Sequence, residues 1–215
     1  MIASKRLHWM YELYLKWRLG ASRFEPKVFV VGFQKTGTTS MGEALKILGF
    51  KHNGWNRTRF RKGFNLMKYQ SDLIQYDSFD DEPFSVFTKS LLRTFPNAKF
   101  IYTTRSPKDW IGSCQRHFSR YEGAHSARSP RDRELDFEFN QKKYGSGDPT
   151  AHASLWQHSF RKHQLLIEKL AKEHPKKFFC IDITNSGVNP WIPLCDFLEL
   201  PLPAIQFPHA NKTQS

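Results

Sequence analysis

The chain has 215 residues, of which 39% are hydrophobic and 15% aromatic, and it carries a formal net charge of +13. This length and composition predict one globular domain with a substantial core, and the sequence contains no run of about 18 apolar residues that would predict a membrane span. Three widely spaced cysteines form no Cys-x-x-Cys pair, so we expect reduced core residues rather than disulfides or metal ligands. The N-terminus has no apolar core typical of a signal peptide, and we therefore expect a cytoplasmic protein.

The excess of positive charge favours an anionic ligand or partner. It would suit a small molecule with several negative charges, an acidic polysaccharide, an anionic lipid or a nucleic acid. The sequence contains no zinc finger, recognition-helix pattern or RNP-like aromatic strand, so no nucleic acid is expected as a partner.

The first 24 residues are predicted to form a unit of their own. Residues 4–19 have the pattern of a basic amphipathic helix with Trp9, Tyr14 and Trp17. We expect this helix to dock on the rest of the chain, and contact with a membrane surface or a partner is the alternative. Residues 25–215 are predicted to form the single domain.

The most informative segment is VFVVGFQKTGTTSMGEALKILG, residues 28–49, which predicts a buried strand at 27–32, a loop and a helix at 38–49. A glycine-containing loop between a strand and a helix N-terminus directs backbone N–H groups at one point, where a phosphate or similar anion binds. The candidate ligand-binding residues of this loop are Gln34, Lys35, Thr36, Gly37, Thr38, Thr39 and Ser40.

This loop resembles a nucleoside-triphosphate loop but departs from it at the lysine. The triphosphate motif requires a lysine directly after its second glycine. Gly32 and Gly37 have the right spacing, but Thr38 follows, and the lysine lies inside the loop as Lys35. A site for a magnesium-bound triphosphate is therefore disfavoured, and a loop that holds one terminal 5′ group, with Lys35 on its bridging oxygen, fits better.

The segment after the first helix is predicted to alternate between loop, strand and helix. HNGWNRTRFRKGF, residues 52–64, is a basic and aromatic loop that leads into a helix near 60–70. DLIQYD at 72–77 predicts a strand, and PFSVFTKSLLRTF at 83–95 predicts a helix.

A second strand-turn-helix motif is AKFIYTTRSPKDWIGS, residues 98–113, with its strand at 99–104. Ser106 is a natural N-cap for the helix that follows. Arg105 lies at the carboxyl end of the strand, where open α/β sheets bind ligands, and Ser113 lies two helical turns further on. Arginine suits a phosphate because its planar guanidinium can bind two oxygens.

The remaining elements complete an α/β pattern. Residues 119–150 are rich in charge, glycine and proline, which predicts a mobile insertion. A long helix is predicted at 152–173 and a further strand at 177–183. Strands alternating with helices predict a parallel sheet of about four to five strands flanked by helices.

These motifs resemble those of the sulfotransferases, which take a sulfuryl group from 3′-phosphoadenosine 5′-phosphosulfate (PAPS). QKTGTTS resembles their 5′-phosphosulfate loop, and Arg105 and Ser113 match the arginine and serine that hold the 3′-phosphate. The ending WIPLCDFLELPLPAIQFPHAN, residues 191–211, resembles that of one branch of the family, as do Trp156 and His163 in LWQHSFRKH. The resemblance spans roughly residues 27–211.

The resemblance implies a P-loop sulfotransferase fold and transfer of a sulfuryl group from PAPS to a hydroxyl or amine, with adenosine 3′,5′-bisphosphate as the product. No metal is expected. The acceptor is expected to be a small molecule or a glycan that carries acidic groups. Two alternatives are a P-loop small-molecule kinase and a non-catalytic protein that binds a nucleotide or an anionic polymer.

Lys35 is expected to stabilise the leaving oxygen, and a carboxylate to act as the base. The family usually supplies the base from the segment after the second core strand, here QYDSFDDEPF at 75–84. Asp77, expected at the end of that strand, is the first candidate. Asp80 is the second, although it can equally cap the helix that follows.

His52 is a further candidate for the base, although a lone loop histidine is more often merely solvated. His52, Trp55 and Arg59 are expected to contact the acceptor, since aromatic faces mixed with positive charge suit a ring bearing acidic groups. A solvated basic helix start is the alternative. Residues 119–150 are also expected to order over the donor as a lid.

Overall fold

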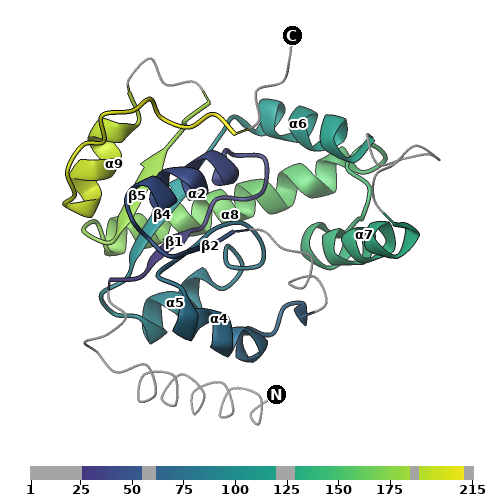
Figure 1. Cartoon of the computed structure of the whole chain (residues 1–215). Coiled ribbons are helices and arrows are strands. Elements are labelled where there is room, and N and C mark those ends of the chain that lie inside the picture. The colour runs from purple at the N-terminus through teal and green to yellow at the C-terminus, as the bar shows by residue number, and fades with distance from the viewer. Residues whose placement is uncertain (1–25, 55–61, 120–128, 185–188, 211–215) are drawn as a thin grey trace.

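The computed structural model describes residues 26–54, 62–119, 129–184 and 189–210 (Figure 1). The predicted N-terminal helix and two of the predicted acceptor contacts, Trp55 and Arg59, lie outside the described residues.

The centre of the fold is a five-stranded parallel sheet with the strand order β2-β3-β1-β4-β5. Its strands are β1 (Val28–Val30), β2 (His52–Asn53), β3 (Ser78–Phe79), β4 (Lys99–Thr103) and β5 (Phe178–Ile181). The short apolar run that predicted a central strand is therefore confirmed, since β1 lies in the middle of the sheet. The expected α/β class with about four to five parallel strands is confirmed as well.

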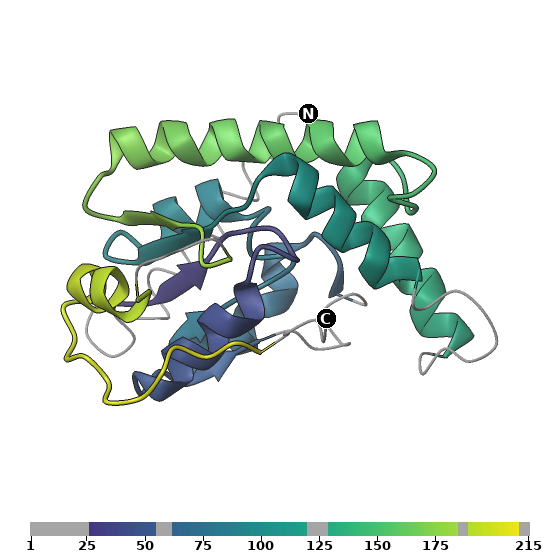
Figure 2. The ribbon, with the colours of Figure 1, turned by 90° about the horizontal axis from the view of Figure 1, so that it is seen from above.

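Helices cover both faces of this sheet. The helical elements of the described ranges are α2 (Thr38–Ile47), the 3-10 helix η1 (Leu66–Tyr69), α4 (Gln70–Gln75), α5 (Thr88–Thr94), α6 (Pro107–Ser119), α7 (Pro130–Tyr144), α8 (Ala153–Glu173) and α9 (Trp191–Leu198). Figure 2 shows α8 running along one face while α2 and α9 lie against the other. None of the helices in the described ranges is long and apolar enough to cross a membrane.

The alternation of side chains along β1 builds two cores. Phe29 and Val31 pack with residues of α4, α5 and α8 on one face of the sheet. Val28 and Val30 pack with residues of α2 and α9 on the other. A strand buried on both faces must be apolar at every position, which explains the uninterrupted run of hydrophobic residues in β1.

The prediction of a strand at 72–77 is wrong. Helix α4 continues to Gln75, and the strand begins only at Ser78. Tyr69 and Leu73, four residues apart, are both fully buried, which is the spacing of one helical face. Similarly, the helix predicted at 83–95 covers only Thr88–Thr94, because the residues before it form turns.

The prediction of irregular structure over 119–150 is wrong for its central part, which forms α7. Ser129 caps this helix by accepting a hydrogen bond from the Asp132 N–H at 3.1 Å, and Pro130 occupies its first turn. Gly145 ends it in the left-handed conformation with φ 84°. The expected mobility of this segment stays a prediction.

Candidate functional site

The loop at residues 32–37, predicted to bind the donor and called the donor loop below, joins the carboxyl end of β1 to the N-terminus of α2. Gly37 occupies the N-cap position with φ 97°, a left-handed conformation that favours glycine. The first hydrogen bond back to the cap is made by Met41, whose N–H donates to Gly37 O at 3.0 Å. The N–H groups of the first turn therefore have no acceptor within the helix, and no acidic residue lies in that turn. This end of α2 is suited to an anion.

Lys35 lies at the tip of the donor loop in the left-handed conformation, with φ 66°. Its ammonium nitrogen lies 3.3 Å from Nδ1 of His117 on α6. Sequence reasoning missed His117, although it lies four residues after Ser113 and therefore on the same side of α6. Ser113, which is predicted to contact the phosphate, thus lies one helical turn before His117, the residue that contacts the loop.

Arg105 follows β4, the strand that pairs with β1. Its Nε is buried and has no hydrogen-bond partner within the described part of the chain. Burial raises the pKa of the Cys114 thiol, while the charges of Lys35 and Arg105 act in the opposite direction. Both cations therefore lie near the same part of α6, where Cys114 follows Ser113. A guanidinium with an unused buried donor fits a phosphate ligand.

Two of the predicted loop ligands use their side chains inside the protein. The Thr36 side chain is fully buried, and its hydroxyl donates to Phe33 O at 2.6 Å and lies 2.8 Å from the Thr103 hydroxyl. The Gln34 amide donates to Tyr144 Oη at 3.3 Å and, at 3.5 Å, to Asn140. Thr36 thus fixes the loop to β4, and Gln34 fixes it to α7.

Among the hydroxyls of α2, Thr38 is buried, whereas Thr39 and Ser40 remain near the loop at the helix surface. The Ser40 hydroxyl accepts a hydrogen bond from the Ala210 N–H at 3.1 Å. The C-terminal segment therefore reaches the first turn of α2.

Asp77 does not lie where the sequence suggested. It precedes β3, and its carbonyl accepts a hydrogen bond from the N–H of Val28 at the start of β1. Its carboxylate accepts from the Lys51 N–H at 3.2 Å. Because the donor loop follows the end of β1, Asp77 lies at the opposite edge of the sheet, and the geometry argues against its assignment as the base.

Asp80, the second candidate, lies at the edge that carries the donor loop. It directly follows β3, and Oδ2 lies 3.5 Å from Nε2 of His52. The other ring nitrogen of His52 lies 2.8 Å from the Ser78 hydroxyl. The side chains of His52 and Asp80 are 1% and 5% exposed, so the structure joins two separately predicted residues into one buried pair.

Helix α2 makes room for this pair at Gly42. A Cβ at that position would lie 2.5 Å from Asp80 Oδ2 and 2.6 Å from His52 Nε2, closer than atoms can pack. The pair therefore lies directly against the second turn of the helix that starts at the donor loop.

We expect Gly42→Ala to destabilise the protein by about 1–3 kcal/mol, because overpacking outweighs the better helix propensity of alanine. Gly112→Ala in α6 is the matched control, since its Cβ would meet only the tip of the Arg116 side chain at 3.3 Å. The control should stabilise the protein by up to about 1 kcal/mol. Urea unfolding measures both, and equal stabilisation by the two changes would contradict this packing.

No group of three or more His, Cys, Asp or Glu side chains arranged to hold a metal occurs among the residues placed by the structure.

Comparison with known proteins agrees with this geometry. A family described as "Sulfotransferase domain" matches residues 27–215. The chain is also 28% identical over 220 residues to Ava biosynthesis cluster protein M of Aspergillus versicolor, a match that covers 85% of this chain and 80% of that protein. The family match includes every described element from the central strand onward, and the chain therefore belongs to the sulfotransferase domain family.

Proposed function

We propose that this sulfotransferase-family protein uses PAPS as its donor and transfers the sulfuryl group to a hydroxyl or amine of an acceptor. The observation that carries the proposal is the placement of two cations. Lys35 follows β1, Arg105 follows the adjacent strand β4, and the charges of both act on Cys114 of α6. Two separate positive groups at one sheet edge suit a donor that carries phosphate at two ends.

Bound PAPS would supply a sulfuryl group on a phosphosulfate linkage, with adenosine 3′,5′-bisphosphate as the leaving group. Arg105 and Ser113 would hold the 3′-phosphate, and the buried Nε of Arg105, which has no hydrogen-bond partner among the described residues, fits that role. The N–H groups at the start of α2 would hold the 5′ end. Lys35 would stabilise the negative charge that develops on the bridging oxygen.

The His52–Asp80 pair supplies the base in this proposal. A new bond forms between the acceptor oxygen or nitrogen and sulfur, and the bond from sulfur to the bridging oxygen breaks. The acceptor's proton passes to a carboxylate oxygen of Asp80, whose Oδ2 lies 3.5 Å from Nε2 of His52. The location of the pair beside α2, the helix that begins at the donor loop, supports this assignment.

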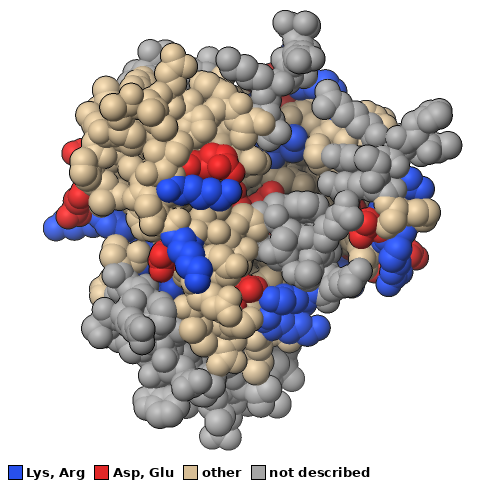
Figure 3. Space-filling model, viewed as in Figure 1, with Lys and Arg blue, Asp and Glu red and all other residues tan. Residues whose placement is uncertain are grey.

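The acceptor is proposed to be a small molecule or a glycan. The name of the Aspergillus relative refers to a biosynthesis cluster, which supports a small-molecule acceptor. Although the net charge is +13, Figure 3 shows basic and acidic side chains interspersed over the described part of this face. The described residues on this face therefore form no continuous basic patch of the kind that binds nucleic acid (Figure 3).

Calorimetric titration with adenosine 3′,5′-bisphosphate tests the donor site. We expect the wild type to bind the bisphosphate in preference to ATP with magnesium, and Arg105→Ala to weaken binding by about 10- to 100-fold, as expected for lost charged hydrogen bonds. Arg161→Ala, which removes an exposed arginine of α8, is the control and should bind like the wild type. Preference for ATP with magnesium would favour a kinase, and the absence of bisphosphate binding would refute the proposal.

A further inference from the structure

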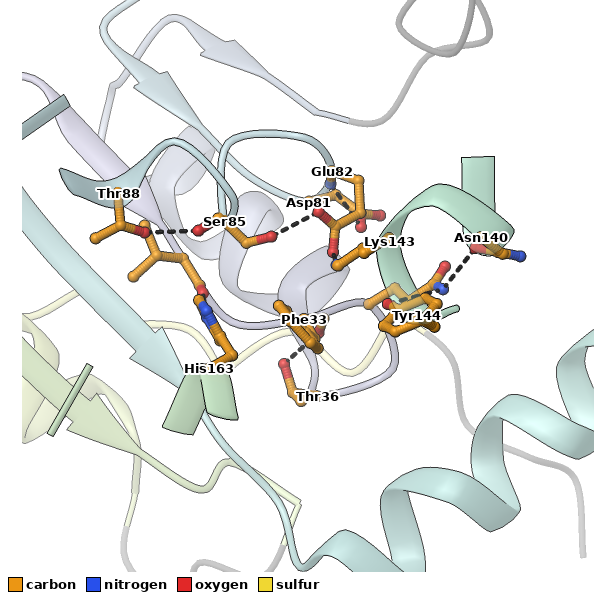
Figure 4. Close-up of polar contacts among 12 residues, drawn as sticks. Phe33, Thr36, Asp81, Glu82, Ser85, Thr88, Asn140, Lys143, Tyr144 and His163 are labelled. Atoms are coloured by element: carbon orange, nitrogen blue, oxygen red, sulfur yellow. Dashed lines mark hydrogen bonds and ion pairs between the residues drawn. The ribbon is translucent and has the colours of Figure 1, made fainter. Parts of the chain in front are cut away.

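Lys143 lies near the C-terminal end of α7, and its ammonium forms a buried ion pair with Glu82 (Figure 4). The two side chains are 4% and 3% exposed. Burial lowers the pKa of Lys143, and the charge of Asp81 acts in the opposite direction. Burying a charged pair costs desolvation free energy, so we expect this pair to have a role other than packing.

The same ammonium also contacts the donor loop. It lies 3.5 Å from the centre of the Phe33 ring, which favours a cation through its negative face. Phe33 is two residues before Lys35, and its ring also stacks on the ring of His163, with the two ring centres 4.2 Å apart. Lys143 therefore touches the loop that carries the donor-binding lysine.

Glu82, the partner of Lys143 in the ion pair, lies in the same turn as the proposed base Asp80. It lies two residues after Asp80 in the turn that follows β3. The Ser85 hydroxyl donates to Glu82 Oε2 at 2.5 Å, and the Thr88 hydroxyl donates to Ser85 O at 2.7 Å. The base-bearing turn is thus fixed to α5 on one side and to Lys143 on the other.

We propose that Lys143 is a positioning residue that holds the donor loop and the base-bearing turn, residues 80–85, at a fixed separation. This inference rests on the proposed function, since the proposed function places the donor at the loop and assigns the proton transfer to Asp80. In-line transfer requires the acceptor, held near the base, to be aligned with the donor. A misplacement of about 1 Å can lower a rate by about 10²-fold.

Hydrogen exchange of the wild-type protein tests this link without any acceptor. We expect adenosine 3′,5′-bisphosphate to slow amide exchange both in the donor loop and in the base-bearing turn, since Lys143 contacts both. Slower exchange in the donor loop alone would refute the positioning role and leave the proposed function intact. Failure of the bisphosphate to bind would instead refute the proposed function, and the positioning role with it.

Lys143→Met, with Lys142→Met at the exposed neighbouring position as control, gives the second test. For Lys143→Met we expect kcat to fall by about 10- to 100-fold, the affinity for the bisphosphate to stay within about 3-fold, and the slowed exchange at 80–85 to be lost. Lys142→Met should behave like the wild type. A Lys143→Met protein that melts earlier but keeps its kcat would show that the residue only stabilises the fold. If this variant does not fold, the wild-type exchange experiment decides alone.

Discussion

Asp80→Asn is expected to lower kcat by about 10²- to 10⁴-fold, the range that removal of a general base commonly produces. The amide keeps the shape of the carboxylate but accepts a proton poorly, so donor binding should be unchanged. Measured sulfate transfer from labelled PAPS to an acceptor found by screening gives kcat, and calorimetry with adenosine 3′,5′-bisphosphate gives the affinity. The exposed fraction of 5% for the Asp80 side chain makes bulk water a poor substitute for the lost base.

Asp77→Asn is the matched control, because Asp77 is the same residue type in the same segment but lies at the amino end of β3. We expect it to keep kcat within a few-fold of the wild type. A large loss in Asp77→Asn with normal turnover in Asp80→Asn would reverse the assignment made from the structure. Equal turnover in all three proteins would place the base elsewhere.

The second large effect concerns stability at mildly acidic pH. Burial lowers the pKa of His163 from 6.5 to about 3, and its Nε2–H donates to Val31 O at 2.7 Å. The unfolded chain therefore takes up a proton below about pH 6.5 that the folded chain does not bind. The contribution of neutral His163 to the free energy of unfolding is complete above pH 6.5 and is lost as the pH falls toward 3. Between pH 7 and 5 we expect a loss of about 2 kcal/mol in the free energy of unfolding from this residue.

His163→Gln should remove this part of the pH dependence, since glutamine can still donate a hydrogen bond but does not titrate. His158→Gln, at an exposed position on the same helix, should keep the wild-type slope. Urea unfolding between pH 5 and 7 measures the difference. If the wild type and His163→Gln lose stability in parallel, His163 does not keep its low pKa in solution.

Patterns local to one element were enough to predict the central strand, its loop and the long helix α8. The motif at 98–113 was also predictable, because a capping serine, a proline and an arginine mark the same turn. The prediction of a strand at 72–77 failed because six residues with apolar positions at 73, 74 and 76 fit a short strand as well as a short helix. Only the packing of Tyr69 and Leu73 into the core decides between these structures.

The candidate site shows where sequence reasoning reaches its limit. The placement of Lys35 and Arg105 at one edge of the sheet could be predicted, because each lies in the segment that follows a strand of that sheet. The His52–Asp80 pair could not, since it depends on β2, a two-residue strand that the sequence assigned to a loop. His117 and Lys143 were missed because their contacts with the loop depend on how α6 and α7 pack against it, and neither helix has a sequence pattern that indicates this packing.

The left-handed conformation of Lys35 has a consequence for the evolution of this loop. A side chain held at φ 66° costs about 1–2 kcal/mol relative to the ordinary helical region, a cost that glycine would avoid. Selection for thermal resistance alone would therefore favour glycine at position 35, and it would remove the ammonium at the same time. A lysine at position 35 therefore lowers the stability of the fold in exchange for a positive charge in the loop. Substitutions meant to stabilise this enzyme should be made at other positions.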